Sequence, residues 1–326
     1  MTTFLTDADV RGVFDWRGAI EALRDAYSVP DDAARFPART MARGDFGWLR
    51  TLSGVPANTG LMGGKLIAAS LAGRRACYLI PLFDQRTAEL VALLDGSSVT
   101  GFRTAATSAL AVDVLAPSRP LRVGVVGSGF EAQHHVRALS AIRELTTVTV
   151  FSPNPASRAR FADSLADLTT PPTAARTAEE TVAGADLVLC AARSRDETPT
   201  LRGAWLAPAM TVVSIGSTLP EQRELDAEAI GRADVIVADT VDEVAHDTGD
   251  MIAAAQVGVA FAGKLISLAS VVSGQVPGRP DPQAVVLYKS AGAAIQDLAV
   301  AAMCARRAAE RQIGTPLTGI VTPVSK

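Results

Sequence analysis

Three cationic side chains in the first third of the sequence stand among apolar or small residues. They are Arg39 in the segment PART, Lys65 in GGKL and Arg103 in GFRT. A cation in such surroundings is usually paired with an anion, because an unpaired charge is costly away from water. If the three converge, two arginine forks and a lysine point charge would form a site for a carboxylate. The alternative is that each makes an ordinary salt bridge at the surface, where most charged residues lie.

A glycine-rich turn with the pattern GxGxxA follows the apolar run 123–126. In dinucleotide-binding domains the first glycine permits a tight turn, and the second lets a pyrophosphate approach the backbone. The small third residue lets the helix pack against the strand. The helix start then offers free N–H groups and a positive dipole end to the phosphates. We therefore expect Gly127, Ser128, Gly129 and Ala132 to bind a dinucleotide; the alternative is a strand-to-helix turn without a ligand.

The next strand bears on the choice of dinucleotide. An NAD site usually ends this strand with an acid that accepts hydrogen bonds from the ribose 2′-hydroxyl. Here the segment FSPN, residues 151–154, contains no acid. A carboxylate would repel a 2′-phosphate, so its absence favours NADP, while NAD stays possible. The side chains that we expect to hold the phosphate are Ser152, Asn154, Ser157 and Arg158.

Strand-like and helical stretches alternate from residue 122 to residue 238. Apolar strand-like runs fall at 122–126, 148–151, 187–191, 211–215 and 235–238, and helical stretches at 131–145, 155–168, 177–183 and 226–233. Such alternation with short connections predicts a parallel sheet with helices on both faces. Right-handed crossovers make it a Rossmann-type doubly wound α/β domain.

A smaller α+β unit is expected before this domain. Thr6 and Asp9 resemble a capping box, and a helix is expected at 15–28. Strands are expected at 46–53, 64–70, 77–84 and 90–94, followed by a helix at 98–115 and a long final helix from 290 to near 314. We place a substrate-binding and dimerisation domain at residues 1–116 and 306–326, and the Rossmann dinucleotide-binding domain at residues 117–305.

Composition narrows the class of protein. The net charge is −3 and no lysine- or arginine-dense run occurs, which argues against a nucleic-acid partner. The three cysteines and three histidines show neither disulfide nor zinc spacing, so we expect no metal. No signal peptide is evident, and no apolar run approaches the ~20 residues that span a bilayer. These features predict a soluble, cytoplasmic protein without a membrane partner.

Short segments in a fixed order also carry a family resemblance. They are PART (37–40), GKL (64–66), LDG (94–96), TGFRTAA (100–106), GSGFEAQ (127–133), AGAD (183–186), IGS (215–217), RELD (223–226), KSAG (289–292) and QD (296–297). With these segments the chain resembles the ornithine cyclodeaminase/μ-crystallin family over nearly its whole length. The resemblance implies a homodimer in which the N-terminal unit binds the substrate and supplies the dimer contact.

The resemblance also implies roles for individual residues. Arg39, Lys65 and Arg103 would hold the carboxylate of the substrate. Thr104 and the glycine turn would touch the phosphates of the cofactor, while Ser290 and Gly292 would lie near the nicotinamide. Asp297 could pair with a cation of the site, although an acid on a helix surface is the more common case.

Two acids that cyclodeaminases of this family use are missing. Residues 46–64 contain no Asp or Glu, and Thr218 stands where the second acid would follow the strand near residue 215. A hydroxyl cannot replace a carboxylate base near neutral pH. We therefore favour a reductase, with Lys65 and Arg103 as catalytic residues and Thr218 in the substrate site.

The expected enzyme is an NAD(P)H-dependent oxidoreductase acting on C–N bonds. It would transfer hydride to the imine carbon of a small 2-imino acid, such as a cyclic ketimine, or act on a 2-oxo or amino acid. Three alternatives stay open. One is a cyclodeaminase-like lyase with bound NAD acting on a diamino acid, and another is an oxidative synthase that splits an amino-acid conjugate. The third is a non-catalytic binder of NADPH or a small ligand.

Overall fold

The computed structural model describes residues 2–192, 194 and 196–324. The chain forms two compact units. Unit 1 contains the described residues up to Thr107 together with those from Ala293 onward, and unit 2 contains those from Ser108 to Gly292. The expected boundaries at 116 and 306 differ from these limits. The second falls inside α11 (Ala294–Arg311), a continuous helix that packs on the strands of unit 1 and on α2 (Trp16–Tyr27).

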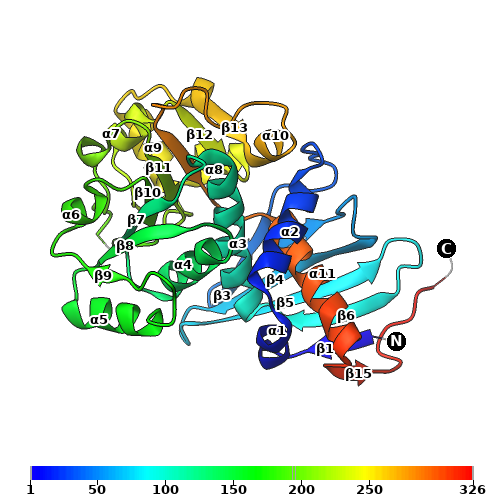
Figure 1. Ribbon diagram of the computed structural model, residues 1–326. Coiled ribbons are helices and arrows are strands. Elements are labelled where there is room, and N and C mark those ends of the chain that lie inside the picture. Colours follow the sequence, from blue (N-terminus) through cyan, green and yellow to red (C-terminus); the bar gives the residue numbers. More distant parts are fainter. Residues whose placement is uncertain (1, 193, 195, 325–326) are drawn as a thin grey trace. The chain divides into compact units, whose positions relative to one another are not determined.

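A parallel sheet forms the centre of unit 2, with helices packed around it (Figure 1). The strand order is β13 (Leu265–Ser267), β12 (Val235–Ala238), β14 (Val286–Lys289), β11 (Thr211–Ser214), β10 (Leu187–Cys190), β7 (Leu121–Val126), β8 (Leu145–Phe151) and β9 (Thr173–Ala174). Every pairing in it is parallel. Strands β10, β11 and β14 are buried along their whole length, as continuous apolar runs in a covered sheet should be. The expected Rossmann-type doubly wound fold is confirmed.

The helices of unit 2 follow the expected alternation with shifts of a few residues. They are α4 (Phe130–Ile142), α5 (Pro155–Ser164), α6 (Ala178–Val182), α7 (Ala227–Arg232), α8 (Val241–Asp247), α9 (Gly249–Gln256) and α10 (Leu268–Val272), with two short 3₁₀ turns at Gly203–Trp205 and Ala262–Lys264. The core beneath them includes Val188, Val212 and Leu287 of the sheet, packed with Ile230 and Met251 of α7 and α9.

Strand β14 is the main element that the sequence patterns do not predict. It follows β12 and β13 along the chain but inserts between β11 and β12 in the sheet. Its four residues are all buried. The expected helix at 290–314 in fact begins at Ala294, because β14 and the loop after it occupy the preceding residues.

Unit 1 contains a mixed sheet. Its order is β15 (Thr315–Leu317), β1 (Thr2–Leu5), β6 (Leu90–Asp95), β5 (Arg75–Asp84), β4 (Leu61–Ser70), β3 (Gly47–Gly54) and β2 (Thr40–Arg43). Only the pairing of β1 with β6 is parallel among the pairings described for this sheet. The four strands expected between residues 46 and 94 are present, and β1, β2 and β15 are additions to them.

Helices cover one face of this sheet. Helix α1 (Asp7–Val13) follows β1, and the expected capping box between Thr6 and Asp9 is present at its start. Helix α11 contacts β3, β4 and β5 and runs beside α2 (Figure 1). Helix α3 (Ser97–Leu115) contributes its first residues to this unit. Among the described residues, no helix is long and apolar enough to cross a membrane.

Candidate functional site

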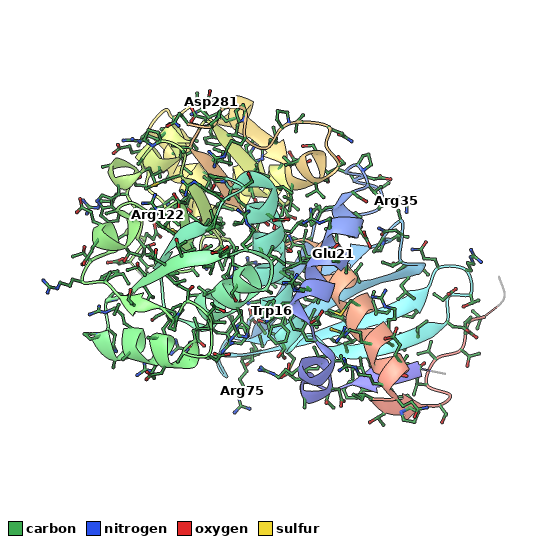
Figure 2. All side chains as sticks on the ribbon, in the orientation of Figure 1. Trp16, Glu21, Arg35, Arg75, Arg122 and Asp281 are labelled. Carbon is green, nitrogen blue, oxygen red and sulfur yellow. The ribbon has the colours of Figure 1, made fainter. Side chains whose placement is uncertain are left out.

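Two of the expected cations meet at one buried carboxylate in unit 1. Lys65 on β4, Arg103 on α3 and Asp297 on α11 are 1%, 7% and 0% exposed. Asp297 Oδ1 lies 2.8 Å from Lys65 Nζ and 2.9 Å from Arg103 Nε. Many charged side chains of the protein are exposed instead, such as Glu21 and Arg122, and Arg75 points away from the ribbon in Figure 2. The structure therefore brings Lys65 and Arg103 together in a buried cluster.

Two further polar side chains orient Arg103, and the sequence patterns indicate no role for either. Arg103 Nη1 donates to Gln296 Oε1 at 2.5 Å, and Gln296 Nε2 donates to the hydroxyl of Tyr27 at 3.0 Å. Gln296 and Tyr27 are 0% and 1% exposed. The guanidinium plane is thus held by a carboxylate on one side and by an amide on the other, which reduces its rotational freedom.

Asp297 is not the surface acid that helix statistics favour. It lies on the apolar stripe of α11, next to Leu298, and its neighbours one turn away are Ala294 and Ala301. All three neighbours are buried. The signal was present in the sequence: an acid that shares the buried face of a helix needs a cation, because a lone charge there is strongly unfavourable.

Arg39 approaches the same cluster from the edge of the sheet. Arg39 directly precedes β2, whose first residue, Thr40, pairs with Thr51 of β3. Leu52, which follows Thr51 in β3, pairs with Lys65 of β4. Continuing that register by one residue places Arg39 across from Leu52, on the face of the sheet that carries Lys65. The charge of Arg39 is near enough to contribute to the lowered pKa of Lys65.

The cluster carries an excess of positive charge. Burial lowers the pKa of Lys65 to about 8, and repulsion by Arg103 and Arg39 adds to this, while Asp297 acts in the opposite direction. Two cations share one carboxylate, and a third cation lies nearby. A further anion, such as the carboxylate of a small molecule, would therefore be stabilised here by charge-assisted hydrogen bonds.

The glycine turn of unit 2 has the geometry that a dinucleotide phosphate requires. Gly127 has φ +112°, and a Cβ there would lie 2.6 Å from the carbonyl oxygen of Ala191. Gly129 is the N-cap of α4, with open space where a Cβ would stand. Ala132 is fully buried, so the helix packs closely. The residues present therefore fit a pyrophosphate at the start of α4.

The expected 2′-phosphate residues lie together at the end of β8. Ser128 Oγ donates to Ser152 Oγ at 2.8 Å, which links the glycine turn to this strand end. Asn154 Oδ1 accepts from the backbone N–H of Ala156 at 2.9 Å and so caps α5. Arg158 lies over the ring of Phe151 and donates through Nη1 to Ser152 O at 2.5 Å. A cation and no acid thus stand at this strand end.

The remaining predicted residues have local partners. Asp239, just after β12, accepts from Ser290 Oγ at 2.6 Å and from the backbone N–H of Gly292 at 2.8 Å, which ties down the loop after β14. Thr104 Oγ1 donates to Thr100 O within α3 at 2.7 Å. The backbone N–H of Thr218 donates to the side chain of Gln222 at 2.9 Å.

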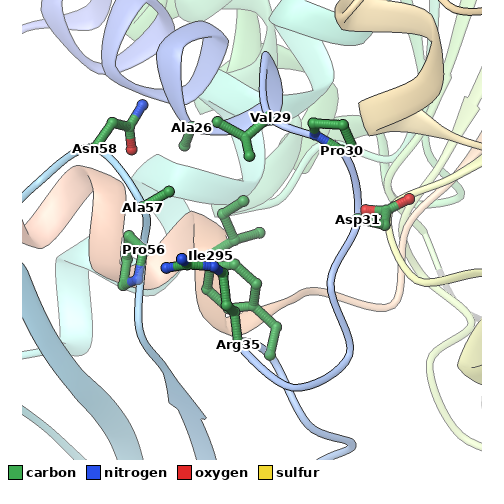
Figure 3. Close-up of a pocket in the computed structure, with 10 residues that line it drawn as sticks. Ala26, Val29, Pro30, Asp31, Arg35, Pro56, Ala57, Asn58 and Ile295 are labelled. Atoms are coloured by element: carbon green, nitrogen blue, oxygen red, sulfur yellow. The ribbon is translucent and has the colours of Figure 1, made fainter.

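A separate hollow in unit 1 is largely apolar (Figure 3). It is lined by Ala26, Val29, Pro30, Asp31, Arg35, Phe36, Pro56, Ala57, Asn58 and Ile295. Ile295 precedes Gln296 on α11, but Lys65, Arg103 and Asp297 do not line this hollow. It is therefore distinct from the cationic cluster. Within the part of the chain that the structure describes, no group of three or more side chains could hold a metal ion.

Comparison with known proteins gives the family. Residues 68–312, well over half of the chain, match the ornithine cyclodeaminase/mu-crystallin family. The chain belongs to this family. The resemblance expected from the sequence is thereby confirmed. The matched range contains Arg103, the glycine turn and Asp297, whereas Arg39 and Lys65 precede it.

Two relatives and one solved structure illustrate what this chain is similar to. The iminosuccinate reductase of Paracoccus denitrificans is 30% identical over 222 residues, which cover 68% of this chain and 67% of that protein. The Delta(1)-pyrroline-2-carboxylate reductase of the same organism is 28% identical over 309 residues, covering 93% of this chain and 96% of that protein. The solved structure of Thermococcus litoralis Delta(1)-pyrroline-2-carboxylate reductase, in complex with NADH and L-proline, has a TM-score of 0.87 and 24% identity. The match covers 97% of this chain and 100% of the Thermococcus chain. It shows that the two proteins share a fold.

Proposed function

We propose that this protein is an NAD(P)H-dependent reductase of a small 2-imino acid. The observation that carries the proposal is the buried cluster of Lys65 and Arg103 around Asp297, with its excess of positive charge. The two Paracoccus relatives are named for substrates that contain both a carboxylate and a C=N bond. Such a molecule combines an anion that the cluster can hold with a carbon that accepts hydride.

The carboxylate of the substrate binds the cationic cluster. Arg103 presents a fixed fork, because Asp297 and Gln296 already hold its orientation. Lys65 adds a point charge, and Arg39 adds a second fork from the sheet edge. Holding the substrate in one orientation relative to the hydride donor can contribute several kcal/mol to catalysis, about 7–11 at the well-oriented limit. Thr218 is the residue of unit 2 that we assign to the substrate site.

A nicotinamide dinucleotide supplies the hydride when it is bound. Gly127, Ser128 and Gly129 would hold its pyrophosphate with the start of α4, where Ala132 permits close packing. Thr104 is assigned to the same phosphates. Ser290 and Gly292, held by Asp239, would border the nicotinamide ring.

A proton must reach the nitrogen of the substrate as hydride reaches its carbon. Lys65 fits this role, since its pKa of about 8 allows the ammonium to release a proton near neutral pH. A bound water is the alternative donor. Asp297 keeps Lys65 charged before the transfer, because the carboxylate opposes the effect of burial on the pKa.

Oxidation of NADPH tests the proposed reaction. The protein is assayed against cyclic imino acids, and against 2-oxo acids with ammonia or methylamine. Arg103→Ala is expected to lose nearly all turnover while it keeps NADPH binding, whereas Arg17→Ala, on the exposed side of α2, keeps both. Normal kcat/KM in Arg103→Ala would overturn the site. Release of ammonia without net consumption of NADPH would identify a lyase instead.

We propose NADP(H) as the preferred cofactor, because Arg158 and no acid stand at the end of β8. Arg158→Ala is expected to weaken NADPH binding about tenfold or more while NADH binding changes little, since a charge-assisted bond to the 2′-phosphate is lost. Dissociation constants from nicotinamide fluorescence measure this, with Arg160→Ala on the same helix as the control. An equal loss for both cofactors would argue against the assignment.

We further propose that the protein is a homodimer joined through the outer face of the unit 1 sheet. Leu49, Leu79 and Val91 on this face are 44%, 39% and 37% exposed. Leu66 is paired with Leu79 in the register and points to the same side. An open apolar sheet face of this kind is typical of an interface between copies.

A further inference from the structure

A second buried ionic cluster lies in unit 2, and the mechanism above does not use it. Its members are Lys289, Ser214, Glu224 and Asp250, and all four are 0% exposed. Lys289 ends β14 and Ser214 ends β11, where the two residues are partners in the strand register. Glu224 follows the loop after β11, and Asp250 is in the first turn of α9.

The four residues form a closed ring of contacts. Lys289 Nζ lies 2.8 Å from Ser214 Oγ and 2.9 Å from Asp250 Oδ2. Ser214 Oγ donates to Glu224 Oε2 at 2.6 Å, and the backbone N–H of Glu224 donates to Asp250 Oδ1 at 2.8 Å. Each member therefore contacts two others, and the link between Glu224 and Asp250 runs through the backbone N–H of Glu224.

Glu224 extends the ring to the loops at the ends of two strands. Its Oε1 accepts from the backbone N–H of Ala192, two residues beyond β10, at 2.9 Å. Its Oε2 accepts from the backbone N–H of Gly216, two residues beyond β11, at 2.8 Å. A Cβ at residue 216 would lie 2.5 Å from Glu224 Oε1, so a larger residue there would displace this carboxylate from its hydrogen bonds.

Only a carboxylate satisfies this arrangement. The two oxygens of Glu224 accept from Ser214 and from two backbone N–H groups, and each of these groups is a donor. A glutamine of the same shape would place its NH₂ group against at least one of them. Burying a charged group is costly, and replacing buried ion pairs by apolar residues often leaves stability unchanged. A contribution to stability therefore gives no sufficient reason for the cluster.

We propose that the Lys289–Ser214–Glu224–Asp250 cluster positions the backbone loops that receive the nicotinamide half of the cofactor. In open α/β sheets, a dinucleotide lies outside the carboxyl ends of the strands. The glycine turn ends β7 and the proposed 2′-phosphate site ends β8, so the other half of the cofactor extends toward β10, β11 and β14. These are the three strand ends that the cluster joins. The inference rests on the proposed function, and its residues act through the loops without touching the reactants.

Comparing the binding of two nucleotides distinguishes a role in positioning the loops from a general effect on stability. Adenosine 2′,5′-bisphosphate contains the 2′-phosphate but no nicotinamide, so it reports on the β7 and β8 side alone. Glu224→Gln is expected to weaken NADPH binding about tenfold, because a charge-assisted network is broken, while the bisphosphate binds within about twofold of wild type. Calorimetry at pH 8.5 measures both, since burial raises the pKa of Glu224 to about 7 and the carboxylate is ionised at that pH.

Two further variants keep the test decisive. Glu228→Gln, on the exposed side of α7, is the matched control and should leave both affinities unchanged. Ser214→Ala retains Glu224 and removes one link of the ring, and it replaces Glu224→Gln if that variant does not fold. If the binding of both nucleotides is weakened equally, or if neither is weakened, the positioning role is overturned while the proposed function stands. A wild-type protein that binds neither nucleotide would overturn the proposed function, and this inference with it.

Discussion

Burial and two neighbouring guanidinium groups lower the pKa of Lys65, whereas its ion pair with Asp297 raises it. The balance leaves the pKa of this lysine at about 8, below its usual value of 10.5. The side chain is charged below this pH and neutral above it. Only the charged form can attract a carboxylate or give up a proton, so the chemistry proposed for the site depends on pH in a definite direction.

The pH profile of imine reduction tests this balance. We expect kcat/KM to fall as the pH rises through about 8, the pKa of Lys65 in the free protein. The corresponding fall in kcat should come at higher pH, because the bound substrate carboxylate stabilises the ammonium. Initial rates measured from pH 6 to 10 give both profiles. In Asp297→Asn the fall should move to lower pH, since the anion that supports the charge is gone. A flat profile up to pH 10 would contradict the role of Lys65.

At the scale of elements, the turn between β7 and α4 contains two glycines whose backbone conformations and surroundings differ. Gly127 is required by the fold, because its φ is +112° and a side chain would meet the backbone of Ala191. Gly129 has φ −81° and open space beside it, so the fold would accept a side chain there. We therefore predict that Gly129 is needed for the approach of a ligand.

Two alanine variants test this distinction. Gly127→Ala is expected to destabilise the protein by about 1–3 kcal/mol through backbone strain, and to weaken NADPH binding as well. Gly129→Ala should stay within about 0.5 kcal/mol of wild-type stability. It should nevertheless lose NADPH affinity, because the new methyl group stands where the pyrophosphate approaches. Thermal unfolding and NADPH titration measure the two effects. NADPH binding unchanged in Gly129→Ala would show that the turn does not hold phosphate.

At the scale of the whole molecule, the two units have different exposed surfaces. Unit 2 buries its sheet among its own helices, whereas unit 1 covers one sheet face with α11 and leaves the other face apolar. Leucines and valine at the centre of that face remain more than a third exposed. A second copy of the chain would remove this surface from water, which is worth roughly 25 cal/mol per Å² of apolar area.

A charge placed on this face tests the dimer. Leu79→Glu is expected to give a monomer in size-exclusion chromatography with light scattering, where the wild type runs as a dimer. The dissociation constant should rise about a hundredfold or more, because the interface would bury an unpaired carboxylate. Val257→Glu, at an exposed position of unit 2, is the control and should stay dimeric. A wild-type protein that is monomeric at micromolar concentration would overturn this assembly.

Local sequence patterns are enough to predict much of the candidate site. The glycine turn is recognisable because its requirements are met within six consecutive residues, and Lys65 and Arg103 stand out among apolar neighbours. Strand β14 is not predicted, because four residues carry too little periodicity to separate them from the helix that follows. Glu224 and Asp250 are not predicted either, because each resembles an ordinary surface acid when only its neighbours in sequence are considered.

The sequence by itself determined the doubly wound fold, the family and the position of the glycine turn, since hydrophobic periodicity and turn residues act over a few positions. Only the tertiary structure decided how the charges pair. Lys65 and Asp297 are 232 positions apart, and Lys289 and Ser214 are 75 apart. Whether a buried charge is stabilised depends on which partner folding brings within about 3 Å, and that distance is a property of the packed chain.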